Sequence, residues 1–123
     1  MMSAERTDLL ERTKAFALKI IRLYSALPRT TVAQVMGKQL LRSGTSVGAQ
    51  LREGKRSRSD AEMLSKTESA LQELEETVYW LELLGDSGTV ERSSLSDVLD
   101  EADQLTKILV TSAKTLKARR RRP

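Results

Sequence analysis

Four stretches of the chain repeat apolar or small side chains at steps of three and four residues. This spacing places the repeated side chains on one face of an α-helix, where they can contact partner helices. The stretches span residues 8–27, 31–55, 60–84 and 95–118. The pattern is clearest in the first stretch, at Leu9, Thr13, Phe16, Ile20, Leu23 and Leu27. The sequence therefore predicts four long helices.

The predicted helices are joined by short connections, as antiparallel neighbours in helix bundles commonly are. We therefore expect an all-α fold, an antiparallel up-down-up-down four-helix bundle. With 123 residues the chain is long enough for one domain with a substantial core. We place this domain at residues 1–118, and we expect residues 119–123, four arginines and a proline, to form a solvated basic tail.

The helix ends are predicted from local signals. Pro28 ends the first helix because the residue before a proline is pushed out of helical geometry. Ser59 and Glu62 match a capping box at the start of the third helix, and Gly85 is expected to end that helix in a left-handed cap. The other predicted N-caps are Thr30 or Thr31 for the second helix and Ser94, with Asp97, for the fourth.

The second stretch contains many residues that are poor choices if helix propensity alone decides its structure. They are Ser43, Gly44, Thr45, Ser46, Gly48 and Ala49. Strand is the competing interpretation here, but the apolar positions do not alternate with a period of two. Because small side chains let helix axes approach closely, we expect this helix to be the most closely packed, with Ser43, Ser46 and Val47 facing inward.

Cysteine and histidine are both absent from the chain. This removes disulfides, thiolate chemistry, the usual metal ligand and the usual general base, and it leaves the serines without a base to activate them. We therefore expect a protein that is not an enzyme and that uses no metal or cofactor. No apolar run approaches the roughly 20 residues of a membrane span, and the N-terminus lacks the apolar centre of a signal peptide. A cytoplasmic location without membrane contact is expected.

Charge is strongly segregated along the chain. Residues 59–103 hold 13 acidic and 2 basic residues, whereas the remainder holds 19 basic and 4 acidic ones. Basic clusters of this kind neutralise phosphates without reading sequence, so we predict binding to the backbone of RNA or DNA. The predicted contact residues are Arg42, Arg52, Lys55, Arg56, Arg58, Lys114, Lys117, Arg119, Arg120, Arg121 and Arg122.

The chain has only four aromatic residues, too few to form a platform for stacking unpaired bases. Tyr79 and Trp80 are predicted to lie at an oligomer interface, where Tyr and Trp are enriched; the rim of the core is the other interpretation for Trp80. Glu53 lies among cations and is interpreted as an ion-pair organiser. A homo-oligomer would gather the basic clusters of several subunits. The alternative function is a protein-interaction scaffold that recruits a partner.

The chain resembles the family called four-helix bundle protein, over about residues 10–90, through the segments QLLRSGTSVGAQLREGKRSRS and ETVYWLELL. Relatives of this family include proteins encoded in intervening sequences of bacterial large-subunit ribosomal RNA genes. The matching positions are Phe16, Pro28, Gln39, Leu40, Arg42, Ser46, Val47, Glu53, Arg56 and Thr77 to Leu84. The resemblance implies a homopentamer, and a distant kinship with the basic accessory proteins of diversity-generating retroelements, which bind nucleic acid and a reverse transcriptase.

Overall fold

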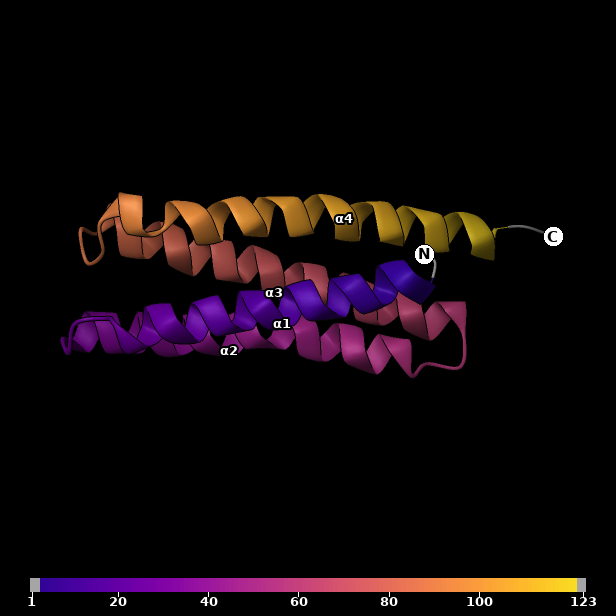
Figure 1. The fold of residues 1–123 in the computed structure, drawn as a ribbon, viewed down its shortest axis with the longest axis horizontal. Coiled ribbons are helices and arrows are strands. Elements are labelled where there is room, and N and C mark those ends of the chain that lie inside the picture. The colour runs from indigo at the N-terminus through magenta and orange to yellow at the C-terminus, as the bar shows by residue number, and fades with distance from the viewer. Residues whose placement is uncertain (1–2, 122–123) are drawn as a thin grey trace.

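The chain folds into four long antiparallel helices (Figure 1). The computed structural model describes the backbone of residues 3–121 and the side chains of residues 8–121. A short 3-10 helix, η1 (Arg92–Ser94), precedes the last long helix, and no strand occurs among the described residues. The predicted all-α, antiparallel up-down-up-down four-helix bundle is confirmed. The long helices are α1 (Ser3–Ser25), α2 (Thr31–Lys55), α3 (Asp60–Asp86) and α4 (Ser96–Arg120).

A main apolar core fills most of the bundle, because each helix turns its three-and-four pattern inward. Its largest fully buried side chains include Phe16 and Ile20 from α1, Leu40 from α2, Leu74 from α3 and Leu105 from α4. A second, smaller cluster lies between the start of α3 and the end of α4 and consists of Met63, Leu64, Ala113 and Leu116. Helix α2 packs most extensively on α3 and also packs closely on α1, whereas α1 and α4 share the smallest contact among these helix pairs.

Ion pairs bridge α1 and α4, which have less contact than the other neighbouring pairs of long helices. Arg12 Nη2 lies 2.7 Å from Glu101 Oε1, and Lys19 Nζ lies 2.9 Å from Asp97 Oδ2. The first pair is also supported by a bond from Arg12 Nε to the second Glu101 oxygen, so the guanidinium binds the carboxylate with two donors. Hydrogen bonding to Glu101 raises the pKa of Arg12.

The small residues of α2 allow close contact on both of its flanks. On the α1 side, a methyl group added to Gly44 would lie only 2.8 Å from Cγ1 of Ile20. On the α3 side, the buried Ser43 hydroxyl lies 2.9 Å from the Thr77 hydroxyl. Ser43 and Val47 face inward as predicted. Ser46 does not, because it lies half-buried at the edge of the helix, where its hydroxyl donates to the carbonyl of Arg42 at 2.7 Å.

The predicted N-caps of α2 and α3 are present. The Thr30 hydroxyl accepts from the Ala33 amide at 3.2 Å, and the Ser59 hydroxyl accepts from the Glu62 amide at 3.1 Å. The reciprocal half of the capping box differs from the prediction. The Glu62 carboxylate accepts from the amide of Arg58, one residue before the cap, so it still satisfies a free amide at the helix start.

Two predicted end signals are wrong. Gly85 lies inside α3, and the left-handed residue is Gly88, with φ of 74°, in the turn that follows. Helix α4 starts after Leu95 without a side-chain cap from Ser94, because residues 92–94 form η1 and Asp97 pairs with a lysine of α1. At its other end α4 continues through Arg120, past the expected end at residue 118.

Candidate nucleic-acid interface

The antiparallel order brings the end of α2, the start of α3 and the end of α4 to the same end of the bundle (Figure 1). We call the group formed by residues 52–58 and 114–121 the basic end. The structure thus brings together nine of the predicted contact residues, although two chain segments about 60 residues apart supply them. The nine are Arg52, Lys55, Arg56, Arg58, Lys114, Lys117, Arg119, Arg120 and Arg121.

Two ion pairs join the α4 segment of the basic end to α3. Arg119 Nη2 lies 3.2 Å from Asp60 Oδ1, and Lys117 Nζ lies 3.4 Å from Glu68 Oε2. Because Asp60 follows Arg58 by two residues, the first pair places the end of α4 beside the α2–α3 connection. These pairs hold the end of α4 against α3, so that both cationic segments lie at the same end of the bundle, and they use only two of its nine cations.

The other seven cations of the basic end are exposed, and none has an ion pair with any described residue. Glu53 lies among them but pairs instead with Lys66 of α3, with Nζ 2.6 Å from Oε2. Glu53 is therefore an ion-pair organiser between two helices, and it leaves the neighbouring cations free to meet an external anion. These seven side chains belong to Arg52, Lys55, Arg56, Arg58, Lys114, Arg120 and Arg121.

Arg42 is not part of the basic end. It lies 13 residues before Lys55 on the same helix, or about 20 Å away along the axis. Its guanidinium binds two carboxylates of α3, at 3.0 Å from Glu73 and closer still to Glu76. Arg42 therefore connects α2 to α3 on the side of the bundle. Arg122, the remaining predicted contact, lies outside the described residues.

The hydrogen bond from Arg42 holds the pKa of Glu76 below its ordinary value of 4.5, and a second hydrogen bond from Trp80 Nε1 at 3.3 Å acts in the same direction. Partial burial opposes both effects. A carboxylate whose pKa is lowered on folding stabilises the folded state above its unfolded pKa, and this contribution is lost as the pH falls through the folded pKa.

Replacing Glu76 with glutamine is accordingly expected to lower the free energy of unfolding at pH 7, because Arg42 loses one of its carboxylates. The difference from the unchanged protein should shrink as the pH falls below 4.5, since the native carboxylate is then being protonated. Urea unfolding of both proteins across this pH range measures the difference. A constant difference down to about pH 2 would contradict the assignment.

The residues predicted at an oligomer interface lie on the same side of the bundle as Arg42. Tyr79 is 55% exposed, and its ring meets Trp80 edge to face with centroids 5.3 Å apart. Trp80 is half-buried and packs partly against the core. Two further apolar side chains, Val32 and Val35 of α2, are more than half exposed.

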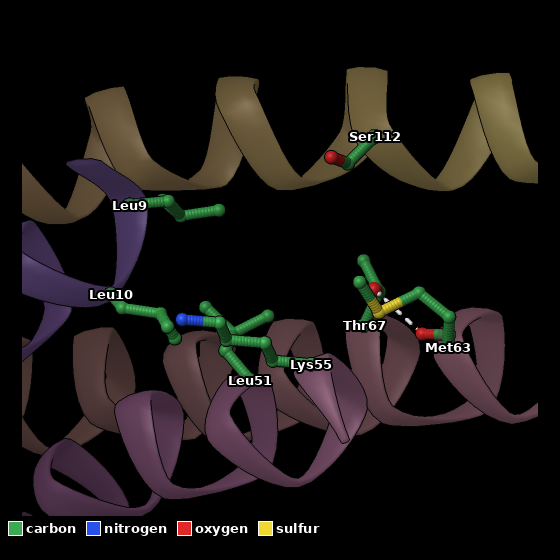
Figure 2. A pocket seen from close by; sticks show the side chains of 7 residues that line it. All are labelled: Leu9, Leu10, Leu51, Lys55, Met63, Thr67 and Ser112. Atoms are coloured by element: carbon green, nitrogen blue, oxygen red, sulfur yellow. Dashed lines mark hydrogen bonds between the residues drawn. The ribbon is translucent and has the colours of Figure 1, made fainter. Parts of the chain in front are cut away.

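A small cavity lies between the four helices near the basic end (Figure 2). Its volume is about 10 Å³, the space of roughly one water molecule, so it cannot hold a cofactor or a small-molecule substrate. A larger ligand would therefore have to bind on the surface of the bundle and not in this cavity. The lining residues are Leu9, Leu10, Leu51, Lys55, Met63, Thr67 and Ser112.

The described side chains include no group of three or more acidic residues placed to hold a metal ion. Among the described helices, none combines the length and apolar character that crossing a membrane requires.

Comparison with known proteins places the chain in a family. A sequence model described as "23S rRNA-intervening sequence protein" matches residues 5–111. A crystal structure of a protein of unknown function from Bacteroides thetaiotaomicron, assigned to the S23 ribosomal protein family, is 36% identical to the chain, with a TM-score of 0.81. The similarity covers 86% of this chain and 98% of that one. None of the curated proteins compared with the chain matches it. The chain therefore belongs to the family of 23S rRNA-intervening sequence proteins.

Proposed function

We propose that this protein is a non-enzymatic nucleic-acid-binding bundle that contacts the phosphates of RNA or DNA through its basic end. The observation that carries the proposal is that two distant segments of the chain bring seven exposed cations to one end of the bundle, none of them in an ion pair with a residue that the structure describes. Each phosphate that such a cation neutralises releases condensed counterions, which favours binding without reading sequence. The family name refers to an intervening sequence of 23S rRNA, which supports an accessory role connected with ribosomal RNA. The resemblance to accessory proteins of retroelements makes a retroelement the other setting for such a role.

Mapping the binding surface tests the location of the site. Amide NMR spectra of the full chain, recorded with and without a mixed-sequence oligonucleotide, should show the largest changes in residues 52–60 and 114–121. Amides near the opposite end, around the α1–α2 connection, should change least. Changes concentrated at that opposite end would reject the basic end as the binding surface.

We also propose that the chain forms a closed homo-oligomer, a pentamer by resemblance, with Tyr79 and Trp80 at the interface. The support is an apolar surface that includes these two rings and the exposed Val32 and Val35. The pairs Arg42–Glu76 and Ser43–Thr77 fix how α2 and α3 are aligned along their axes. In this antiparallel alignment Val35 lies opposite residues 83–85, about one helical turn beyond Trp80. Assembly would bring several basic ends onto one ligand and raise their joint affinity through effective concentration.

Replacing Tyr79 with serine is expected to lower the oligomer mass measured by light scattering, because an exposed ring is removed from the proposed interface. Tyr79 tests the interface more cleanly than Trp80, whose ring also packs against the core. Val110→Ser on α4 is the matched control and should leave the mass unchanged. The unchanged protein should exceed its monomer mass of 13.8 kDa, and a monomer at micromolar concentration would reject the oligomer.

A protein-interaction scaffold is the second candidate function, and the same exposed valines and Tyr79 favour it. In that case the apolar surface would receive a different protein, for which the resemblance implies a reverse transcriptase. The two functions differ in what the basic end does. A scaffold that does not bind nucleic acid would show no mobility shift of an oligonucleotide even at about 50 mM salt.

A further inference from the structure

Three exposed cations form a straight row along the outer side of α4. Lys107, Lys114 and Arg121 follow one another at intervals of seven residues, so two turns of helix separate each from the next. At a rise of 1.5 Å per residue the row is about 21 Å long. Lys107 has a partner only in Asp103, one turn earlier at 3.1 Å, and the other two have no ion pair with a described residue. We call these three residues the outer row.

The outer row continues into the basic end, since Lys114 and Arg121 belong to both. From residue 104 to residue 121, α4 and its C-cap carry six cations and no acidic residue. Asp103 lies beside the first cation of the row, and beyond it α4 itself offers a polyanion cations without an acidic residue between them. Lys107 belongs to the basic run that the sequence shows on the last helix, although it is not among the predicted contact residues, and the seven-residue spacing of the three cations is the signal that adds it.

No aromatic side chain lies at the basic end. Phe16 is fully buried, and Tyr24 lies at the far end of α1, where its hydroxyl bonds Gln34. Tyr79 and Trp80 follow the start of α3 by about 20 residues, or roughly 30 Å along the helix. Proteins that hold unpaired strands rely on stacking bases against such rings. The basic end lacks this means of holding a single strand.

We propose that the nucleic acid bound at the basic end is a duplex, with one phosphate backbone lying along the outer row. This inference rests on the proposed function and adds the class of ligand. A duplex is stiff over about 150 base pairs, so it can follow a straight row without the ordering cost that a flexible strand would pay. It also gains more from each phosphate contact, since the salt slope per contact is about −0.9 for a duplex and −0.7 for a single strand.

The test compares fluorescence-labelled 20-base-pair duplexes of DNA and of RNA with one strand of each, in a sequence that cannot pair with itself, at about 0.1 M salt. Anisotropy titrations of the full chain should give duplex affinities about tenfold or more above those of the strands, because seven contacts differ in slope by about 0.2 each. Whichever duplex binds more tightly identifies RNA or DNA as the source of the phosphates.

The triple variant K107Q, K114Q, R121Q should lose about 10²-fold of its duplex affinity, at about eightfold for each lost contact. The matched control is the triple variant R22Q, R29Q, K38Q, which should bind as the unchanged protein does. It removes three exposed cations that lie away from the basic end and form no ion pair with the part of the chain that the structure describes. A strand that binds as tightly as the duplex would overturn this inference and leave the proposed function standing. Failure of all four probes to bind would overturn the proposed function itself, and full affinity in the K107Q, K114Q, R121Q variant would remove the outer row from the site.

Discussion

Replacing Arg52, Arg56 and Arg58 with glutamine is expected to weaken nucleic-acid binding by about 10²–10³-fold at 0.1 M salt. Each phosphate contact contributes about 0.9 to the slope of log affinity against log salt, or about eightfold between 0.1 M and 1 M salt. The three side chains are exposed and form no ion pair within the described chain, so the bundle should fold as before. Anisotropy titrations measure the affinity, and circular dichroism checks the fold.

The control for this variant is again the R22Q, R29Q, K38Q triple, which changes the net charge by the same amount in another part of the bundle. If net charge alone determined the affinity, the two triples would weaken binding equally. Equal weakening would therefore contradict a localised site. Unequal weakening, with the larger loss in the basic-end variant, is what the position of these arginines predicts.

Replacing Gly44 with valine is expected to lower the free energy of unfolding by about 2–3 kcal/mol, because overpacking a well-filled core commonly costs about this much. The added Cβ would lie 2.8 Å and 2.9 Å from the two γ carbons of Ile20. Both carbons are attached to a branched Cβ close to the α1 backbone, so they cannot rotate away freely. The cost should exceed the few tenths of a kcal/mol that valine gains over glycine in helix propensity.

Urea unfolding measures the effect of Gly44→Val, and Ala49→Val is the matched control on the same helix. Ala49 is exposed, so its replacement should cost only the difference in helix propensity, about 0.6 kcal/mol. A Gly44 variant as stable as the Ala49 variant would contradict the close approach of α1 and α2.

The helical architecture could be predicted from the sequence because burial repeats with the period of the helix. Phe16, Leu40, Leu74 and Leu105 occupy the pattern positions and are all fully buried. The details at helix ends could not be predicted as well. Whether Gly85 or Gly88 takes the left-handed conformation depends on how far α3 continues against its neighbours, and this is a property of the packing.

The basic end could be predicted in outline, because antiparallel order alone places residues 52–58 and 114–121 at the same end of a four-helix bundle. The pairing of individual charges could not be predicted. Arg42 looks equivalent to the other arginines in the sequence, but the register of α2 against α3 sets it between two glutamates. Glu53 likewise forms its ion pair with Lys66 of α3, although Arg52, Lys55 and Arg56 are closer to it in sequence.

The salt dependence of nucleic-acid affinity tests the central claim most directly. The affinity of the unchanged protein for a mixed-sequence duplex should fall steeply between about 50 mM and 200 mM salt, with a log–log slope between about −3 and −6, since up to seven free cations can each neutralise one phosphate. No binding at about 50 mM salt, or an affinity that does not change with salt, would contradict a site built on phosphate contacts.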